Sequence, residues 1–118
     1  RRNWKDLQNK FSGILGLAMR AGKVRSGEFA SEKSLKSGKS KLILVSEDTS
    51  ENTKKKFRDQ CRHRGVPIYE VGTKRELGHW IGREERSSVS IEDAGFSEQM
   101  KRILDGGESE WQRKATKI

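Results

Sequence analysis

The sequence contains a single cysteine, Cys61, and a single proline, Pro67, among its 118 residues. A lone cysteine cannot form a disulfide within the chain, which is typical of proteins from reducing compartments. No uninterrupted apolar run approaches the roughly 18 residues that a membrane span requires. We therefore expect a cytoplasmic protein that does not use a membrane as a partner.

Apolar residues are also scarce, and cations are abundant. Hydrophobic residues make up 31% of the chain and charged residues 36%, so the hydrophobic core must be thin. The 26 lysines and arginines outnumber the 17 aspartates and glutamates, which gives a net charge of +9. Such a charge favours a polyanionic partner. The length is that of one modest domain.

Helical and strand-like patterns alternate along the chain. Apolar residues at helical spacing predict helices within residues 1–20, 28–37, 51–64, 74–81 and 96–104. Strands are expected at 23–25, 41–45, 66–71 and 87–91. The run "KLILV" is continuously apolar, which indicates a strand covered on both faces. This order predicts an α/β fold, a three-layer α/β/α sandwich around a small mixed sheet of about four strands.

The C-terminal segment differs in composition from the rest of the chain. We expect a single folded domain over residues 1–104. Residues 105–118, "DGGESEWQRKATKI", contain few apolar side chains. They are expected to form a flexible tail.

The string "SGKS" around Gly38 suggests a nucleotide-binding loop, but its context excludes one. A Walker-type loop needs a glycine five positions before Gly38, where this chain has Lys33. It also needs a preceding strand and a following helix, whereas here the order is reversed. The expected role is a helix C-terminus flanked by basic residues.

No pattern indicates catalysis, a metal or another cofactor. His63 and His79 lack metal-ligand spacing, and Cys61 falls on the apolar side of its helix. The acidic string "SEDTSE" follows a strand, where some α/β folds bind magnesium. Helix capping by Thr49 or Ser50 is favoured over a metal site there. The chain is therefore not expected to be an enzyme.

Several strings occur in the order and at the spacing of one protein family. They are "LGLAMRAGKVRSGE", "KLILVSEDTSENTKKK", "VPIYEV", "ELGHWIG" and "DAGF", between Phe11 and Leu104. The chain thereby resembles the superfamily of the archaeal ribosomal proteins L7Ae and L30e, and within it the bacterial YlxQ-like branch. The resemblance implies an α/β/α sandwich that binds RNA.

The resemblance also implies a binding site. Family members bind kink-turn RNA, a sharply bent duplex with tandem sheared G·A pairs. They bind it through a glycine-led turn into the second helix, a lysine one or two turns later, and a loop after the "LG…G" helix. In this chain the loop consists of Arg83, Glu84, Glu85 and Arg86. The corresponding RNA-binding residues in this chain are Ser26, Gly27, Glu28, Phe29, Lys33, Lys36, Lys39, Arg83, Glu84 and Arg86.

This chain departs from the family pattern at the base-reading positions. If Gly38 is aligned with the glycine that ends the family helix, Phe29 and Ala30 replace the usual Asn-Glu pair. Kink-turn specificity is therefore not expected. We expect a monomeric, non-enzymatic protein that binds ribosomal or other structured RNA, with ribosomal proteins as further candidate partners. The alternative is a protein-interaction adaptor of the same fold that has lost RNA binding.

Overall fold

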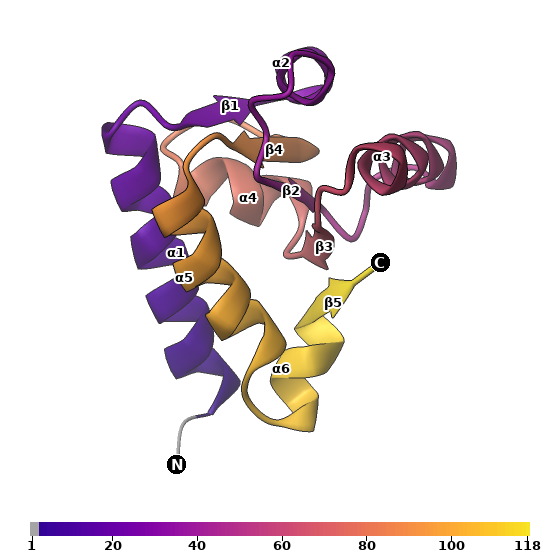
Figure 1. Ribbon diagram of the computed structural model, residues 1–118. Coiled ribbons are helices and arrows are strands. Elements are labelled where there is room, and N and C mark those ends of the chain that lie inside the picture. The colour runs from indigo at the N-terminus through magenta and orange to yellow at the C-terminus, as the bar shows by residue number, and fades with distance from the viewer. Residues whose placement is uncertain (1–2) are drawn as a thin grey trace.

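The computed structural model describes residues 3–118, which form six α-helices and five β-strands (Figure 1). The helices are α1 (Trp4–Arg20), α2 (Glu28–Lys36), α3 (Glu51–Arg64), α4 (Lys74–Trp80), α5 (Ala94–Asp105) and α6 (Ser109–Lys114). The strands are β1 (Val24–Ser26), β2 (Leu42–Val45), β3 (Ile68–Val71), β4 (Ser88–Ile91) and β5 (Ala115–Lys117).

The strands form one mixed sheet in the order β1-β4-β2-β3-β5. Strands β2 and β3 pair in parallel, and the other neighbours pair antiparallel. Helices α1 and α5 lie side by side on one face, where α4 and α6 also pack (Figure 1). Helices α2 and α3 cover the opposite face. The predicted three-layer sandwich is confirmed, with five strands in place of about four.

Strand β2 is buried on both faces, as its uninterrupted apolar sequence predicted. Leu42 and Leu44 belong to the larger core, which α1, α4, α5 and α6 cover. Ile43 and Val45 belong to a smaller core beneath α2 and α3, where they pack with Phe57. Successive side chains of a strand point to opposite faces, so one strand joins the two cores.

Strand β4 alternates between serine and aliphatic residues, yet all four of its residues are buried. Val89 and Ile91 join the larger core. Ser88 and Ser90 face the other side of the sheet, where Ser90 bonds to Ser34 of α2 across 2.7 Å. The alternation therefore separates an apolar buried face from a polar buried face, rather than a buried face from an exposed one.

Residues 105–118 are not an unpacked tail, and that expectation is wrong. Their helix α6 buries Trp111 completely, and the Trp111 indole Nε1 donates a hydrogen bond to the carbonyl of Ile103 at 2.8 Å. Strand β5 then pairs with β3, with Ala115 opposite Val71. One large aromatic ring and a row of backbone hydrogen bonds supply the packing. A count of apolar residues takes Trp111 as a single residue whatever its size, and it does not register backbone hydrogen bonds at all.

The acidic segment after β2 caps helices, as expected. The Ser50 hydroxyl accepts a hydrogen bond from the Thr53 amide at 3.2 Å at the start of α3. Asp48 Oδ1 accepts the Lys74 amide of α4 at 2.9 Å, and this bond lowers the pKa of the Asp48 carboxyl despite the opposing effect of burial. The segment thus positions two helix N-termini.

Candidate nucleic-acid interface

The turn from β1 into α2 depends on Gly27. Its backbone has φ 96° and ψ 161°, a conformation that side-chain-bearing residues rarely adopt. The Gly27 amide donates to the Ser88 carbonyl at 2.8 Å, which ties the turn to the start of β4. Glycine is therefore the residue that this turn favours.

The N-terminus of α2 has no side-chain cap, because glycine occupies the capping position. The first amides of a helix have no intrahelical acceptor. The amides of Glu28, Phe29 and Ala30 are therefore available at the positive end of the helix dipole. Such an end can bind phosphate oxygens or the acceptor atoms of bases.

The Phe29 side chain lies on the surface beside these amides. Among residues 3–118, the exposed large hydrophobic side chains are Phe29, at 80%, and Leu17, at 50%. Phe29 lines an open hollow of about 470 Å³ between the turn and the segment that precedes β4. The hollow is lined by Ser26, Gly27, Glu28, Phe29, Ala30, Glu85, Arg86 and Ser87.

Arg86 brings a positive charge to this hollow. Its Nε donates a hydrogen bond to Ser26 Oγ at 3.3 Å, and its terminal nitrogen donates to the Glu85 carbonyl at 3.0 Å. These bonds hold the guanidinium beside the turn. A planar guanidinium is well suited to contacts with phosphate and with base edges.

Two contacts fix the loop that carries Arg86. The carbonyl of Ser87 accepts the Ser46 amide at 2.9 Å and the Thr49 hydroxyl at 3.2 Å. The loop also folds back over Gly78, where a Cβ atom would lie 1.9 Å from the Glu84 carbonyl oxygen. The glycine of "ELGHWIG" therefore permits a close backbone approach that alanine would obstruct.

Glu28 is engaged within the protein. Its carboxylate pairs with Lys56 of α3 at 2.6 Å, and Glu32 lies 3.8 Å from the same ammonium group. The hydrogen bond with Glu28 raises the pKa of Lys56, although burial acts in the opposite direction. Lys56 thus links α2 to α3 and offsets the negative charge of Glu28 near the turn. The basic run of α3 gave no sign of this role in the sequence.

The structure separates the other predicted site residues. Arg83 and Glu84 line a different hollow, together with His79. Lys33 is exposed on α2, and Lys36, farther along, pairs with Glu32 at 3.6 Å. Lys39 lies beyond the other end of α2. Ala30 and Ser87 line the hollow but were not among the predicted RNA-binding residues. Ala30 occupies one of the two base-reading positions, whereas Ser87 was indicated only by its neighbours in the sequence.

The fold and the segments that form this hollow occur within a known family. The model of the "Ribosomal protein L7Ae/L30e/S12e/Gadd45 family" matches residues 9–101. The chain belongs to this family. The matched range contains the Gly27 turn and Arg86, whereas α6 and β5 lie beyond it.

Relatives of this L7Ae-family chain include bacterial and archaeal proteins. "RNA-binding protein YlxQ" of Bacillus subtilis (strain 168) is 42% identical over 92 residues, covering 78% of this chain and 92% of the relative. "Large ribosomal subunit protein eL8" of Thermoplasma volcanium is 31% identical over 97 residues, covering 81% and 80%. The predicted YlxQ-like assignment is confirmed.

A solved structure has the same fold. It is described as "a protein with unknown function from Bacillus halodurans C" and superimposes with a TM-score of 0.80 at 36% identity. The match covers 82% of this chain and 98% of the other chain.

Within residues 3–118, no helix has the length and apolar character to cross a membrane. The same residues contain no cluster of three or more histidine, cysteine, aspartate or glutamate side chains that could hold a metal ion.

Proposed function

We propose that this protein is a non-enzymatic RNA-binding protein that binds an unpaired base of a structured RNA at the N-terminus of α2. The names of its relatives support RNA as the ligand, since they describe an RNA-binding protein and a large ribosomal subunit protein. The net charge of +9 supports a polyanionic ligand as well.

The observation that carries the proposal is the exposure of Phe29. A phenylalanine ring that is 80% exposed presents its large apolar faces to a ligand rather than to the core. Proteins that bind looped or single-stranded RNA stack unpaired bases on such rings. The Phe29 ring is a platform of this kind.

The neighbouring groups would hold the nucleotide around a stacked base. The free amides of Phe29 and Ala30 can donate to a phosphate or to a base edge. Arg86, fixed by Ser26, supplies the positive charge on the other side of the hollow. Stacking and phosphate contacts thus converge within one surface.

This mode of binding differs from the reading of sheared G·A pairs. Asn and Glu side chains can form hydrogen bonds with base edges, whereas Phe29 and Ala30 have apolar side chains. Recognition then depends on an accessible base rather than on the edges of a non-canonical pair. We propose a preference for looped or bulged RNA without selectivity for kink-turns.

Fluorescence anisotropy with a labelled RNA hairpin and a blunt duplex of equal length tests the proposal. The protein should bind the hairpin more tightly than the duplex. Phe29→Ala should weaken hairpin binding by about 1 to 3 kcal/mol, the range measured for base–aromatic stacking. The duplex, which has no unpaired base, should be bound almost equally by both proteins.

Leu17→Ala is the matched control, because Leu17 is the other exposed large hydrophobic residue between positions 3 and 118 and lies on α1. It should leave hairpin binding unchanged. Hairpin affinity should also fall with salt, with a log–log slope between about 2 and 5 as phosphates are neutralised. Equal effects of the two substitutions, or affinity that does not depend on salt, would contradict the proposal and favour a protein-interaction role.

A further inference from the structure

A second basic surface lies at the opposite end of α2 from Phe29. The turn after α1, the loop after α2 and the end of β4 surround a hollow of about 430 Å³ there. A neighbouring hollow of about 490 Å³ shares Gly38 and Lys41 with it and adds His63 and Arg64 from the end of α3. The first hollow is lined by Gly22, Lys23, Arg25, Gly38, Lys39, Lys41 and Glu92. We call the two hollows together the basic groove.

Backbone hydrogen bonds hold the three segments of the first hollow together. The Glu92 amide donates to the Lys23 carbonyl at 2.8 Å, and the Lys41 amide donates to the Ile91 carbonyl at 2.7 Å. The Lys39 amide donates to the Ser34 carbonyl at 3.2 Å at the end of α2. Lysines that are distant in sequence therefore occupy fixed neighbouring positions.

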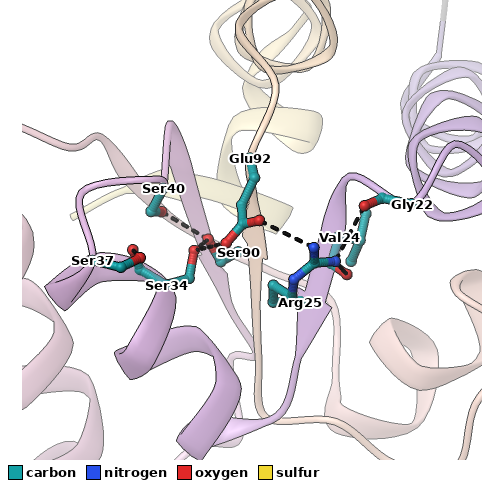
Figure 2. A network of polar contacts seen from close by, with 8 residues as sticks. All are labelled: Gly22, Val24, Arg25, Ser34, Ser37, Ser40, Ser90 and Glu92. Atoms are coloured by element: carbon teal, nitrogen blue, oxygen red, sulfur yellow. Dashed lines mark hydrogen bonds and ion pairs between the residues drawn. The ribbon is translucent and has the colours of Figure 1, made fainter.

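Glu92 is the acidic residue of the hollow, and its carboxylate is engaged by neighbouring side chains (Figure 2). It accepts a hydrogen bond from Ser34 Oγ at 2.6 Å and pairs with Arg25 at 3.4 Å. Arg25 also donates to the Gly22 carbonyl at 3.1 Å. A buried chain from Ser34 through Ser90 to Ser40 continues this network beneath the hollow (Figure 2).

The network leaves an excess of positive charge in the groove. Arg25 and Glu92 balance each other, whereas Lys23, Lys39 and Lys41 form no ion pair within residues 3–118. All three of these lysines are exposed. The free ammonium groups are thus presented on a surface whose only local carboxylate is already neutralised.

We infer that the basic groove is a second RNA-binding surface, which contacts the phosphates of a stem that extends from the base bound at Phe29. The inference rests on the proposed function and adds to it. Helix α2 has nine residues, and nine residues of helix rise about 14 Å. One folded RNA can therefore reach both ends of α2.

The chemistry of the groove indicates a phosphate backbone rather than a base sequence. Lysine ammonium groups are flexible point charges suited to phosphates, and they carry little sequence information. No phenylalanine, tyrosine or tryptophan side chain lines either hollow. The two ends of α2 thus contact different parts of the RNA. Phe29 stacks on a base at the N-terminal end, and the basic groove contacts the phosphates of the stem at the other end.

Two labelled RNAs and two double variants test this division. The first RNA is a hairpin with a stem of about 16 base pairs, and the second is its loop sequence alone as a strand of about nine nucleotides. The groove variant is Lys39→Gln with Lys41→Gln. The matched control is Lys10→Gln with Lys117→Gln, which removes the same charge from α1 and from the far edge of the sheet.

The groove variant should weaken hairpin binding by about fivefold or more and reduce the salt slope by about 1.5, with little change for the loop strand. The control should change neither affinity by more than about twofold. Equal losses from the groove variant and the control would overturn the inference, because they indicate diffuse charge attraction. Equal losses for both RNAs would also overturn it.

Failure of the proposed function gives a different result. Suppose that Phe29→Ala leaves loop-strand binding intact while the groove variant still weakens hairpin binding. RNA binding by the basic groove is then supported, and base stacking on Phe29 is wrong. If the unmodified protein binds neither RNA, both proposals fail. Displacement of the hairpin by polyglutamate of equal charge would overturn the inference in favour of an acidic protein partner.

Discussion

Arg86 Nε donates a hydrogen bond to Ser26 Oγ across 3.3 Å, which joins two residues 60 positions apart in the sequence. Ser26 ends β1, and Arg86 lies in the segment between α4 and β4. The bond turns two separate segments into one surface around Phe29. A substitution in either segment should therefore act on the same RNA-binding event.

Arg86 and Arg83 should differ in importance although both belong to the same loop. Arg86 lines the hollow with Phe29, whereas Arg83 lines a separate one. Arg86→Ala should weaken hairpin RNA binding by about fivefold or more, and Arg83→Ala by less than about twofold. Anisotropy titrations at fixed salt measure both. A larger loss from Arg83→Ala would place the RNA on the other side of the loop.

Lys33 should also contribute to RNA binding. It is exposed and lies on α2 six residues after Gly27, so its ammonium group can contact a phosphate of an RNA bound at the start of the helix. Lys33→Ala should weaken hairpin binding by about fivefold or more, with a melting temperature close to that of the unmodified protein. Lys117→Ala on β5 serves as the control. Equal losses from the two substitutions would indicate charge attraction without a defined site.

Restoring the family pair should change the RNA preference. The unmodified protein should bind a standard kink-turn no more than about tenfold tighter than an equal-length duplex, or about 1.4 kcal/mol. Phe29→Asn with Ala30→Glu should raise this ratio, because these side chains can hydrogen-bond to G·A pairs. Titration of both RNAs against both proteins measures it. Strong kink-turn selectivity of the unmodified protein would refute the assignment of these two positions.

Gly78→Ala should destabilise the protein and displace the loop that carries Arg86. The new Cβ would lie 1.9 Å from the Glu84 carbonyl oxygen, so the backbone must shift, at a cost of about 1 to 3 kcal/mol. Gly13→Ala is the matched control, since nothing lies within 4 Å of its Cβ position in α1. It should stabilise the helix by about 0.5 to 1 kcal/mol. Urea denaturation distinguishes the two outcomes.

Trp111→Ala should lower the free energy of unfolding by about 3 to 5 kcal/mol, because the ring is fully buried against the larger core. Trp111→Phe keeps most of the buried ring but leaves the Ile103 carbonyl without its indole donor, and it should cost less. Urea denaturation monitored by circular dichroism measures both. A loss under about 0.5 kcal/mol for the alanine variant would restore the mobile-tail interpretation.

Cys61 should make stability fall at alkaline pH. Burial raises the pKa of its thiol to about 12, whereas an unfolded cysteine titrates near about 8.5. Above that lower value the unfolded chain loses a proton that the folded protein keeps, so the free energy of unfolding decreases as pH rises. Urea titrations between about pH 8 and pH 10 should show this decrease, and Cys61→Ala should reduce it. Rapid labelling of the native thiol would contradict its burial.

Local sequence was sufficient to predict most helices and strands, because their signals lie within a few residues of one another. Thr73 and Glu76, three residues apart, form a capping box at the start of α4. Helix α3 runs from Glu51 to Arg64 and ends at Gly65 in the left-handed conformation. Steric limits on φ and hydrogen bonds three or four residues apart are properties of the local chain.

The candidate site was only partly predictable. Gly27 and Phe29 share one turn, so a motif could identify them together. Lys39 follows the C-terminal end of α2, but its position beside Lys23 depends on how the helix packs on the sheet. The network that neutralises Glu92 depends on Arg25 and Ser34 meeting it from other elements.

The sequence by itself determined the α/β order of elements, the turn at Gly27 and the excess of positive charge. Tertiary structure alone decided that Trp111 fills the core, that β5 extends the sheet, and that Arg86 meets Ser26. Strand pairing uses backbone groups that every residue carries, so composition cannot reveal it. A contact such as that of Arg86 with Ser26 exists only after the chain has folded, because the two residues are 60 positions apart. The pairing of β4 with β1 brings their segments together.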